Sequence, residues 1–150
     1  MKLRLIVVGK MQTDYAACEQ RYRKRFGSHG CELQLIELSE GRGKQSAQRK
    51  QEEERQILQH ARAGYILFDA CGKARSSVQW ADTLQSMAAN ATQDFVIGGT
   101  DGVSASIRQQ AAQCWSLSAL TLPHQMARLL VVEQLYRAWT IVQGHPYHRV

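Results

Sequence analysis

The chain has 150 residues, of which 44% are hydrophobic, 21% are charged and only two are prolines. This composition suits one compact domain with an apolar core and excludes long disordered stretches. A net charge of +6 favours a polyanionic partner. No stretch approaches the roughly 18 apolar residues of a membrane span, and the apolar run Leu5–Val8 is too short for a signal peptide. We therefore expect a cytoplasmic protein with no membrane association.

Strands and helices alternate along the chain. In chain order, the hydrophobic patterns predict a strand at 2–8, a helix at 12–26, a strand at 31–38, a helix at 46–63, a strand at 65–69, a helix at 76–91, a strand at 95–98, a helix at 104–113, a strand at 114–117 and a helix at 124–142. Ser76 or Ser77 is suited to cap the third helix, and Ser104 the fourth. The alternation implies an α/β fold: a single domain over residues 1–150, with a mainly parallel sheet and helices on both faces.

The basic residues are concentrated in the first part of the chain. Residues 1–64 carry 13 bases and 8 acids, whereas residues 65–150 carry 6 and 5. The bases at Arg21–Arg25 and at Arg42–Lys50 form either a solvated surface or a set of contacts to RNA phosphates. The four cysteines lack C-x-x-C spacing and have no suitably placed histidine, so we expect free thiols and no metal site.

Two glycine-rich or small-residue segments follow predicted strands. In Phe95–Val103, a strand ends at Gly98-Gly99, and a third glycine follows before the next helix. Ligands of open α/β sheets bind beyond the carboxyl ends of strands, where glycines let the backbone come close. The segment is therefore either a ligand loop or a plain tight turn. In Trp115–His124, an uncharged loop leads into the last helix, and this pattern alone favours an ordinary strand–helix connection.

The last predicted helix and the tail after it are unusual. Apolar residues surround the helix, which predicts core packing on one side and a subunit contact on another. Glu133 and Arg137 have the spacing of a helical ion pair. Together with Arg128, these residues either stabilise the structure through ion pairs or have a role in function. The tail holds His145, Tyr147, His148 and Arg149, residue types that suit base stacking, phosphate contact and proton transfer.

Taken together, these motifs resemble the SPOUT-class (α/β-knot) methyltransferases that act on a pseudouridine of large-subunit ribosomal RNA. The resemblance covers the whole chain. It rests on Lys2–Gly9, Gly72-Lys73 with Ser76-Ser77, Phe95–Gly102, Trp115–His124, Glu133–Ala138 and Pro146–Arg149.

The resemblance implies a C-terminal trefoil knot, a homodimer and an S-adenosylmethionine molecule held in the knot. It implies methylation of N3 of a pseudouridine in 23S rRNA on the assembled 70S ribosome. The family's cofactor contacts correspond here to Phe68, Gly98, Gly99, Leu117, Ser118, Ala119, Leu120, Thr121 and Leu122.

Methylation of a ring nitrogen that carries a proton calls for a base and for charge stabilisation. We expect His148 to accept the N3 proton, with His124 a weaker candidate because a helix N-terminus disfavours its protonated form. Arg149 and Arg137 would stabilise charge on the carbonyl oxygens beside N3, and Tyr147 would stack on the base. In a dimer, the tail would complete either its own site or that of the partner.

Two other functions remain open. One is a knotted methyltransferase for ribose 2′-OH groups or for tRNA. The other is a ribosome-binding assembly factor without catalysis, against which the intact Gly98-Gly99 and Leu117–Leu122 segments argue.

Overall fold

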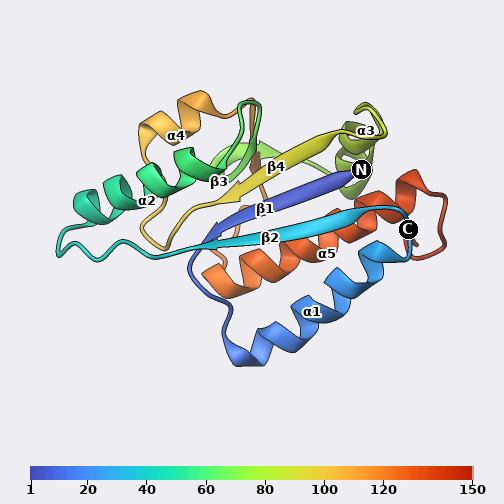
Figure 1. Ribbon diagram of the computed structural model, residues 1–150, viewed down its shortest axis with the longest axis horizontal. Helices are drawn as coiled ribbons and strands as arrows, with labels where there is room; N and C mark the ends of the chain where they lie inside the picture. The colour runs from blue at the N-terminus through green and yellow to red at the C-terminus, as the bar shows by residue number, and fades with distance from the viewer. Residues whose placement is uncertain (150) are drawn as a thin grey trace.

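A five-stranded, all-parallel sheet forms the centre of the protein (Figure 1). The computed structural model describes residues 1–149. The sheet has the order β2-β1-β4-β3-β5. Its strands are β1 (Lys2–Val8), β2 (Glu32–Leu38), β3 (Ile66–Ala74), β4 (Thr92–Ile97) and β5 (Gln113–Ser116). Because the strands are parallel, their carboxyl ends meet at one edge of the sheet, where open α/β folds bind ligands.

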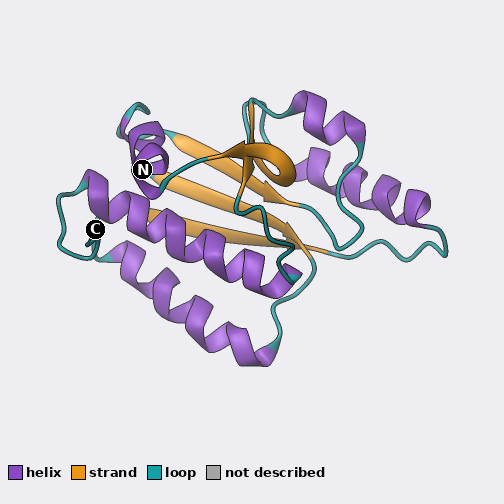
Figure 2. Ribbon diagram, turned by 180° about the vertical axis from the view of Figure 1, so that it is seen from behind, coloured by secondary structure: helices purple, strands orange, loops and turns teal. Residues whose placement is uncertain are grey.

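Helices cover both faces of this sheet, as the alternation predicted. On one face lie α1 (Thr13–Gly27), α3 (Ser77–Gln85) and α5 (His124–Val142). On the other lie α2 (Ser46–His60) and α4 (Ala105–Gln110). Figure 2 shows the long helices α1 and α5 side by side across the sheet. No helix within residues 1–149 is long and apolar enough to cross a membrane.

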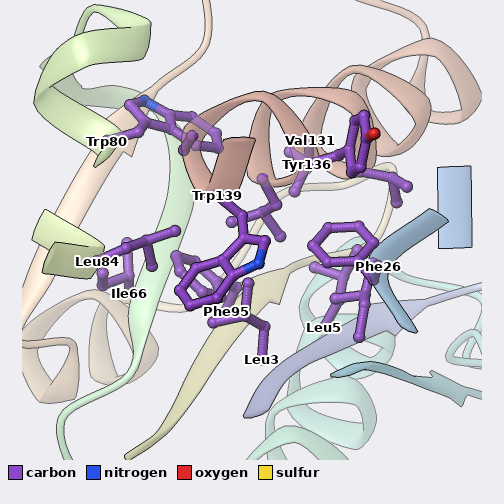
Figure 3. Packing of buried hydrophobic residues seen from close by; sticks show 14 of the residues in the cluster. Leu3, Leu5, Phe26, Ile66, Trp80, Leu84, Phe95, Val131, Tyr136 and Trp139 are labelled. Atoms are coloured by element: carbon purple, nitrogen blue, oxygen red, sulfur yellow. The ribbon is translucent and has the colours of Figure 1, made fainter. Parts of the chain in front are cut away.

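The side-chain alternation of β1 divides the core into two layers. Leu3, Leu5 and Val7 face α1 and α5, where Phe26 and Trp139 pack against the same layer (Figure 3). The other layer contains Ile6 and Val8 of β1 together with Leu38, Ile57, Tyr65, Leu67, Val96, Val103 and Ile107. Most of the apolar sequence is therefore used in holding the helices to the sheet.

The observed elements agree with the predicted ones in order and type, and differ at some ends. Helix α5 has the predicted bounds, and Ser76 and Ser104 cap α3 and α4. The third helix ends at Gln85, six residues before the predicted end. The third strand extends to Ala74 because it leaves the ladder after Phe68 and pairs with β5 again at Lys73. The predicted trefoil knot concerns how this part of the chain is threaded, and it stays a prediction.

Candidate cofactor-binding site

A cavity opens at the carboxyl edge of the sheet, where β4 ends and β3 leaves the ladder after Phe68. Its volume is about 430 Å³, and a smaller cavity of about 140 Å³ adjoins it. Phe68, Asp69, Ala70, Ile97 and Ala127 line both cavities, so the two form one continuous hollow. Volumes of this order hold small-molecule ligands in other proteins.

The wall formed by residues 98–102 depends on closely packed glycines. A Cβ atom on Gly98 would lie 2.3 Å from Cγ1 of Val103, and one on Gly99 would lie 2.5 Å from Oε2 of Glu53. Gly102 has a φ of +80°, a conformation that favours glycine. Its N–H donates to the Gly99 carbonyl at 3.0 Å, which closes the turn. The sequence left a ligand loop and a tight turn as alternatives, and the structure shows a tight turn that lines a cavity.

The opposite wall is the loop between β5 and α5. The Ser116 hydroxyl donates to the Ser118 carbonyl at 3.1 Å, and the Leu120 N–H donates to the Ser118 hydroxyl at 3.0 Å. The N–H groups of Ala119 and Leu122 donate no hydrogen bond to any part of residues 1–149. The Leu120 side chain is 75% exposed at the rim of the small cavity. Free backbone donors beside an exposed apolar side chain can bind both the polar edge and the flat face of a ligand.

The structure brings together most of the residues predicted to contact the cofactor. Phe68, Gly98, Gly99, Leu117, Ser118, Leu120 and Leu122 line the two cavities, whereas Ala119 and Thr121 belong to the same loop but do not line them. His124 also lines the larger cavity. Its Nε2 lies 2.8 Å from the Val8 carbonyl oxygen, so this ring is held at the end of β1.

Sequence reasoning missed a charged pair in this cavity. Asp69 accepts a hydrogen bond from Nε of Arg108 at 3.1 Å and one from the Cys71 N–H at 2.9 Å. Burial opposes ionisation of Asp69, but these two hydrogen bonds outweigh it and lower its pKa. Asp69 is therefore a carboxylate at neutral pH and places a negative charge on the cavity wall. The signal in the sequence was an acidic residue at the end of an apolar strand.

The tail residues lie at the opposite edge of the sheet. Trp139, near the end of α5, donates from Nε1 to the carbonyl of His29 at 2.7 Å, and His29 precedes β2. The ring of His145 also lies against His29, with centroids 4.8 Å apart. Since His124 lies at the carboxyl end of β1, helix α5 spans the sheet from one edge to the other. Within one chain, the structure therefore does not bring the tail to the cavity.

Tyr147 packs within its own chain. Its ring lies edge-on to Tyr136, with centroids 4.9 Å apart; its hydroxyl donates to Glu133 at 3.1 Å and lies 3.4 Å from the hydroxyl of Tyr22. Burial, with these hydrogen bonds, raises the pKa of Tyr147. The Tyr147 hydroxyl therefore stays protonated near neutral pH.

Arg137 belongs to the same cluster. Its Nε donates to Oε1 of Glu133 at 2.9 Å, and its guanidinium carbon lies 4.9 Å from the centre of the Tyr147 ring. The ion pair expected from the spacing of Glu133 and Arg137 thus forms, and it also orients the tail. Both nitrogens of His148 are enclosed and have no partner among residues 1–149, while Arg149 is exposed.

Arg128 is separate from this cluster and has a structural role. Its side chain is 1% exposed and pairs with Glu19 at 2.6 Å and with Glu37 at 2.6 Å. It also donates to the Gly9 carbonyl at 3.3 Å. This network ties α5 to α1 and to the ends of β1 and β2.

Comparison with known proteins decides the family. Residues 1–148 match the family described as "Predicted SPOUT methyltransferase". The chain belongs to this SPOUT methyltransferase family. It is 40% identical to ribosomal RNA large subunit methyltransferase H of Hydrogenovibrio crunogenus and 41% identical to the protein of that name from Hahella chejuensis, and each match covers 99% of both chains. The family membership confirms the resemblance stated from the motifs.

A solved structure agrees with the fold. A probable methylase family protein from Haemophilus influenzae Rd KW20 superposes with a TM-score of 0.59 at 14% identity, over 99% of this chain and 70% of that one. The likeness confirms the α/β fold.

Proposed function

We propose that this protein transfers a methyl group from S-adenosylmethionine to N3 of a pseudouridine in 23S rRNA of the large ribosomal subunit, on the assembled 70S ribosome in the cytoplasm. The observation that carries the proposal is the full-length match, at 36–41% identity, to proteins named ribosomal RNA large subunit methyltransferase H. The cavity at the carboxyl edge supports it, because that edge is where an α/β fold would hold a methyl donor.

The residues of the cavity suit S-adenosylmethionine, which supplies an electrophilic methyl group on a positively charged sulfur. Leu117, Leu120 and Leu122 offer apolar surface to an adenine, and the free N–H groups of the loop offer donors to its edge. The carboxylate of Asp69 offers a negative group to a cationic ligand, although Arg108, which lines the same cavity, offsets part of its charge. We propose that the predicted residues Phe68, Gly98, Gly99 and Leu117–Leu122, with Asp69 added, hold the cofactor, inside the trefoil knot that the family resemblance implies.

The surface formed by α1 and α5 supports a homodimer. An apolar hollow of about 370 Å³ lies there, lined by Cys18, Tyr22, Met126, Leu129 and Leu130 and bordered by Glu133 and Arg137. Met126 is 47% exposed. Such a patch with a charged border is typical of a protein–protein interface. A second copy of the chain is the partner that the family resemblance implies.

The length of α5 favours action of the tail on the partner's site. Nineteen residues at a rise of 1.5 Å place the end of α5 about 28 Å from His124, and the tail folds back only as far as Glu133, about 14 Å from His124 along the helix. A group this far from the cavity cannot reach a base bound there, since proton transfer needs hydrogen-bond distance. We propose that each cavity is completed by the tail of the partner subunit.

The tail residues then supply the remaining chemistry. His148 accepts the N3 proton of the base, because both of its ring nitrogens lack a partner among residues 1–149; since they are enclosed in the single chain, the ring must turn outward to reach the base. Arg149 and Arg137 donate hydrogen bonds to the carbonyl oxygens that flank N3, where negative charge develops. Tyr147 packs in its own chain, which favours a role in holding Arg137 in place. This packing argues against the expected stacking of Tyr147 on the base. His124, already bound to the Val8 carbonyl, remains the weaker candidate for the base.

The decisive experiment is methylation of ribosomes from a strain that lacks the gene. Purified protein, labelled S-adenosylmethionine, 70S ribosomes and, in a parallel reaction, total tRNA from the same strain are incubated, and the modified nucleotide is mapped by mass spectrometry. We expect one methyl group on a pseudouridine of 23S rRNA, at N3. A label on a ribose or on tRNA would establish the first alternative. Absence of both methylation and cofactor binding would establish the assembly factor.

A further inference from the structure

Helix α2 holds the loop of residues 39–44 through side-chain contacts to the loop backbone. Gln56 bonds to both the N–H and the carbonyl of Ser39, at 3.1 and 2.9 Å. Glu53 accepts from the Gly41 N–H at 3.0 Å, and Glu52 accepts from the Arg42 N–H at 2.8 Å. The position of this loop is therefore set by α2.

Arg49 links the same loop to the turn of residues 98–102. Its guanidinium donates to the carbonyls of Gly43 and Lys44 at 3.0 and 3.1 Å. On its other side it donates to both carboxylate oxygens of Asp101, at 2.6 and 3.2 Å. The hydrogen bond from Arg49 is the main reason why the pKa of Asp101 is lowered. One planar side chain thus bridges the two loops, and Arg49 lies 52 residues from Asp101 in sequence.

Glu53, one helical turn further on, makes the same connection by packing. Its side chain is buried, and its Oε2 has no hydrogen-bond partner among residues 1–149. The backbone of Gly99 lies so close to this carboxylate that a Cβ atom there would be 2.5 Å from Oε2. A shift of α2 would therefore move the turn that forms a wall of the cofactor cavity.

The two loops border two different cavities. The turn 98–102 lines the proposed cofactor cavity. The loop 39–44 borders a separate cavity of about 530 Å³, lined by Lys10, Ser39, Glu40, Gly41, Arg42 and Gln125. The side chains of Arg42 and Lys44 are exposed and form no ion pair within residues 1–149. Exposed, unpaired bases beside a cavity suit RNA phosphates.

We propose that Arg49 and Glu53 are positioning residues that couple S-adenosylmethionine binding to the binding of RNA phosphates at loop 39–44. This inference rests on the proposed function and adds a link between its two ligands. RNA held by Arg42 and Lys44 fixes the conformation of loop 39–44. Through their contacts, Arg49 and Glu53 then fix the conformation of the turn 98–102. The cofactor binds to a turn that is already ordered. By thermodynamic linkage, the cofactor strengthens RNA binding by the same factor.

The test measures the Kd of S-adenosylhomocysteine, a non-reactive form of the cofactor, without and with unmethylated 70S ribosomes. The coupling is the Kd without ribosomes divided by the Kd with ribosomes. We expect a ratio of about 5 or more in the wild type, the lower end of common allosteric couplings. Arg49→Met and Asp101→Asn should each lower the ratio to the part that Glu53 alone transmits. The double variant should be no worse than either single variant, because both remove the same contact.

Three further variants separate coupling from general damage. Arg49→Lys keeps the charge but lacks the planar fork, so it should retain only part of the ratio. Lys2→Met removes an exposed ion pair to Glu32 at the other edge of the sheet and should leave the ratio unchanged. The double variant Arg42→Gln, Lys44→Gln should weaken ribosome binding, with a smaller salt dependence, and should leave the Kd measured without ribosomes unchanged.

Each outcome has a definite meaning. Wild-type protein that binds no S-adenosylhomocysteine would refute the proposed function. If the wild type binds S-adenosylhomocysteine with the same Kd without and with ribosomes, only the coupling is refuted. The coupling through Arg49 is also refuted if Arg49→Met shows the same ratio of Kd values as the wild type. A structural defect would raise both Kd values together and leave the ratio intact. If Arg49→Met fails to fold, Asp101→Asn decides, because Asn is nearly isosteric with Asp and the site is partly exposed.

Discussion

Completion of each cavity by the partner's tail predicts that two inactive variants restore activity when mixed. Gly98→Val disables the cavity, since its Cβ would lie 2.3 Å from Cγ1 of Val103 and the turn must shift. Arg149→Ala disables the tail, with a loss of about two to three powers of ten for one donor. In a mixed dimer, the intact tail of the first variant meets the intact cavity of the second, and the other site contains both defects.

The magnitude follows from counting sites. Random pairing of equal amounts gives mixed dimers as about half of the total, each with one good site of two, so the mixture should show about a quarter of wild-type activity. Each variant alone should show about 1% or less. If each tail served its own cavity, every site in the mixture would contain a defect, and mixing would restore nothing.

The assay is ribosome methylation after the two variants are co-expressed with different tags and the mixed dimer is purified through both. The purified mixed dimer should reach about half of wild-type activity, because one of its two sites is intact. Mixed dimers as inactive as the parents would refute the exchange of tails, while leaving the cofactor cavity unaffected. Full activity of Arg149→Ala by itself would instead remove Arg149 from the mechanism.

The remaining predictions concern the interface and two buried charges. Leu129→Asp should give monomers by light scattering. The matched change Leu58→Asp, on the opposite face of the sheet, should leave the dimer intact. Monomers from both variants, or from neither, would contradict the assigned interface. Arg128→Ala leaves Glu19 buried without its partner and should lower the free energy of unfolding in urea by about 3–5 kcal/mol, and a loss below about 1 kcal/mol would contradict the structural role. Burial raises the pKa of Glu53, and the nearby charges of Asp101 and Glu40 add to this effect. The hydrogen bond from the Gly41 N–H and the charge of Arg49 offset it only in part. The contribution of Glu53 to stability is therefore full below its unfolded-state pKa and falls as the pH rises through its folded-state pKa. Glu53→Gln should therefore gain stability relative to wild type as the pH rises above about 4, the ordinary pKa of a glutamate, when both are compared by thermal unfolding. A difference that stays constant with pH would be evidence against a raised pKa.

The sequence predicted the fold class well because the relevant signals are local. Strand and helix periods determined the order of elements, and hydroxyl side chains at Ser76 and Ser104 determined where two helices begin. Helix α5 has the predicted ends because Pro123 precedes it and Gly144, with a φ of +65°, follows it. These features are readable from neighbouring residues alone.

Features that depend on distant residues were not predicted. The extension of β3 requires Gly72 to lie against the backbone of Trp115, where a Cβ atom would be 2.5 Å from the Trp115 carbonyl carbon. Nothing in the polar segment 69–73 indicates that it returns to the sheet. The pairing of Asp69 with Arg108 likewise joins residues 39 positions apart. The glycine pair and the small-residue loop are visible as local features, but the pattern alone left a tight turn and an ordinary connection open, and the prediction that they hold a cofactor came from the family resemblance.

The placement of the tail shows what sequence order alone conceals. His124 and His148 both belong to the C-terminal segment, and the motifs suggest that they serve one site. The intervening helix is continuous over 19 residues and buried along Val131, Leu135 and Ala138, so it holds its two ends apart at opposite edges of the sheet. The same helix presents Leu129 and Arg137 on its outer surface. A second copy bound there in an antiparallel arrangement would bring each tail toward the other copy's cavity. Pairing of subunits would then assemble the catalytic groups as well as cover an apolar surface, and a monomer would retain the cofactor cavity without the residues that act on the RNA.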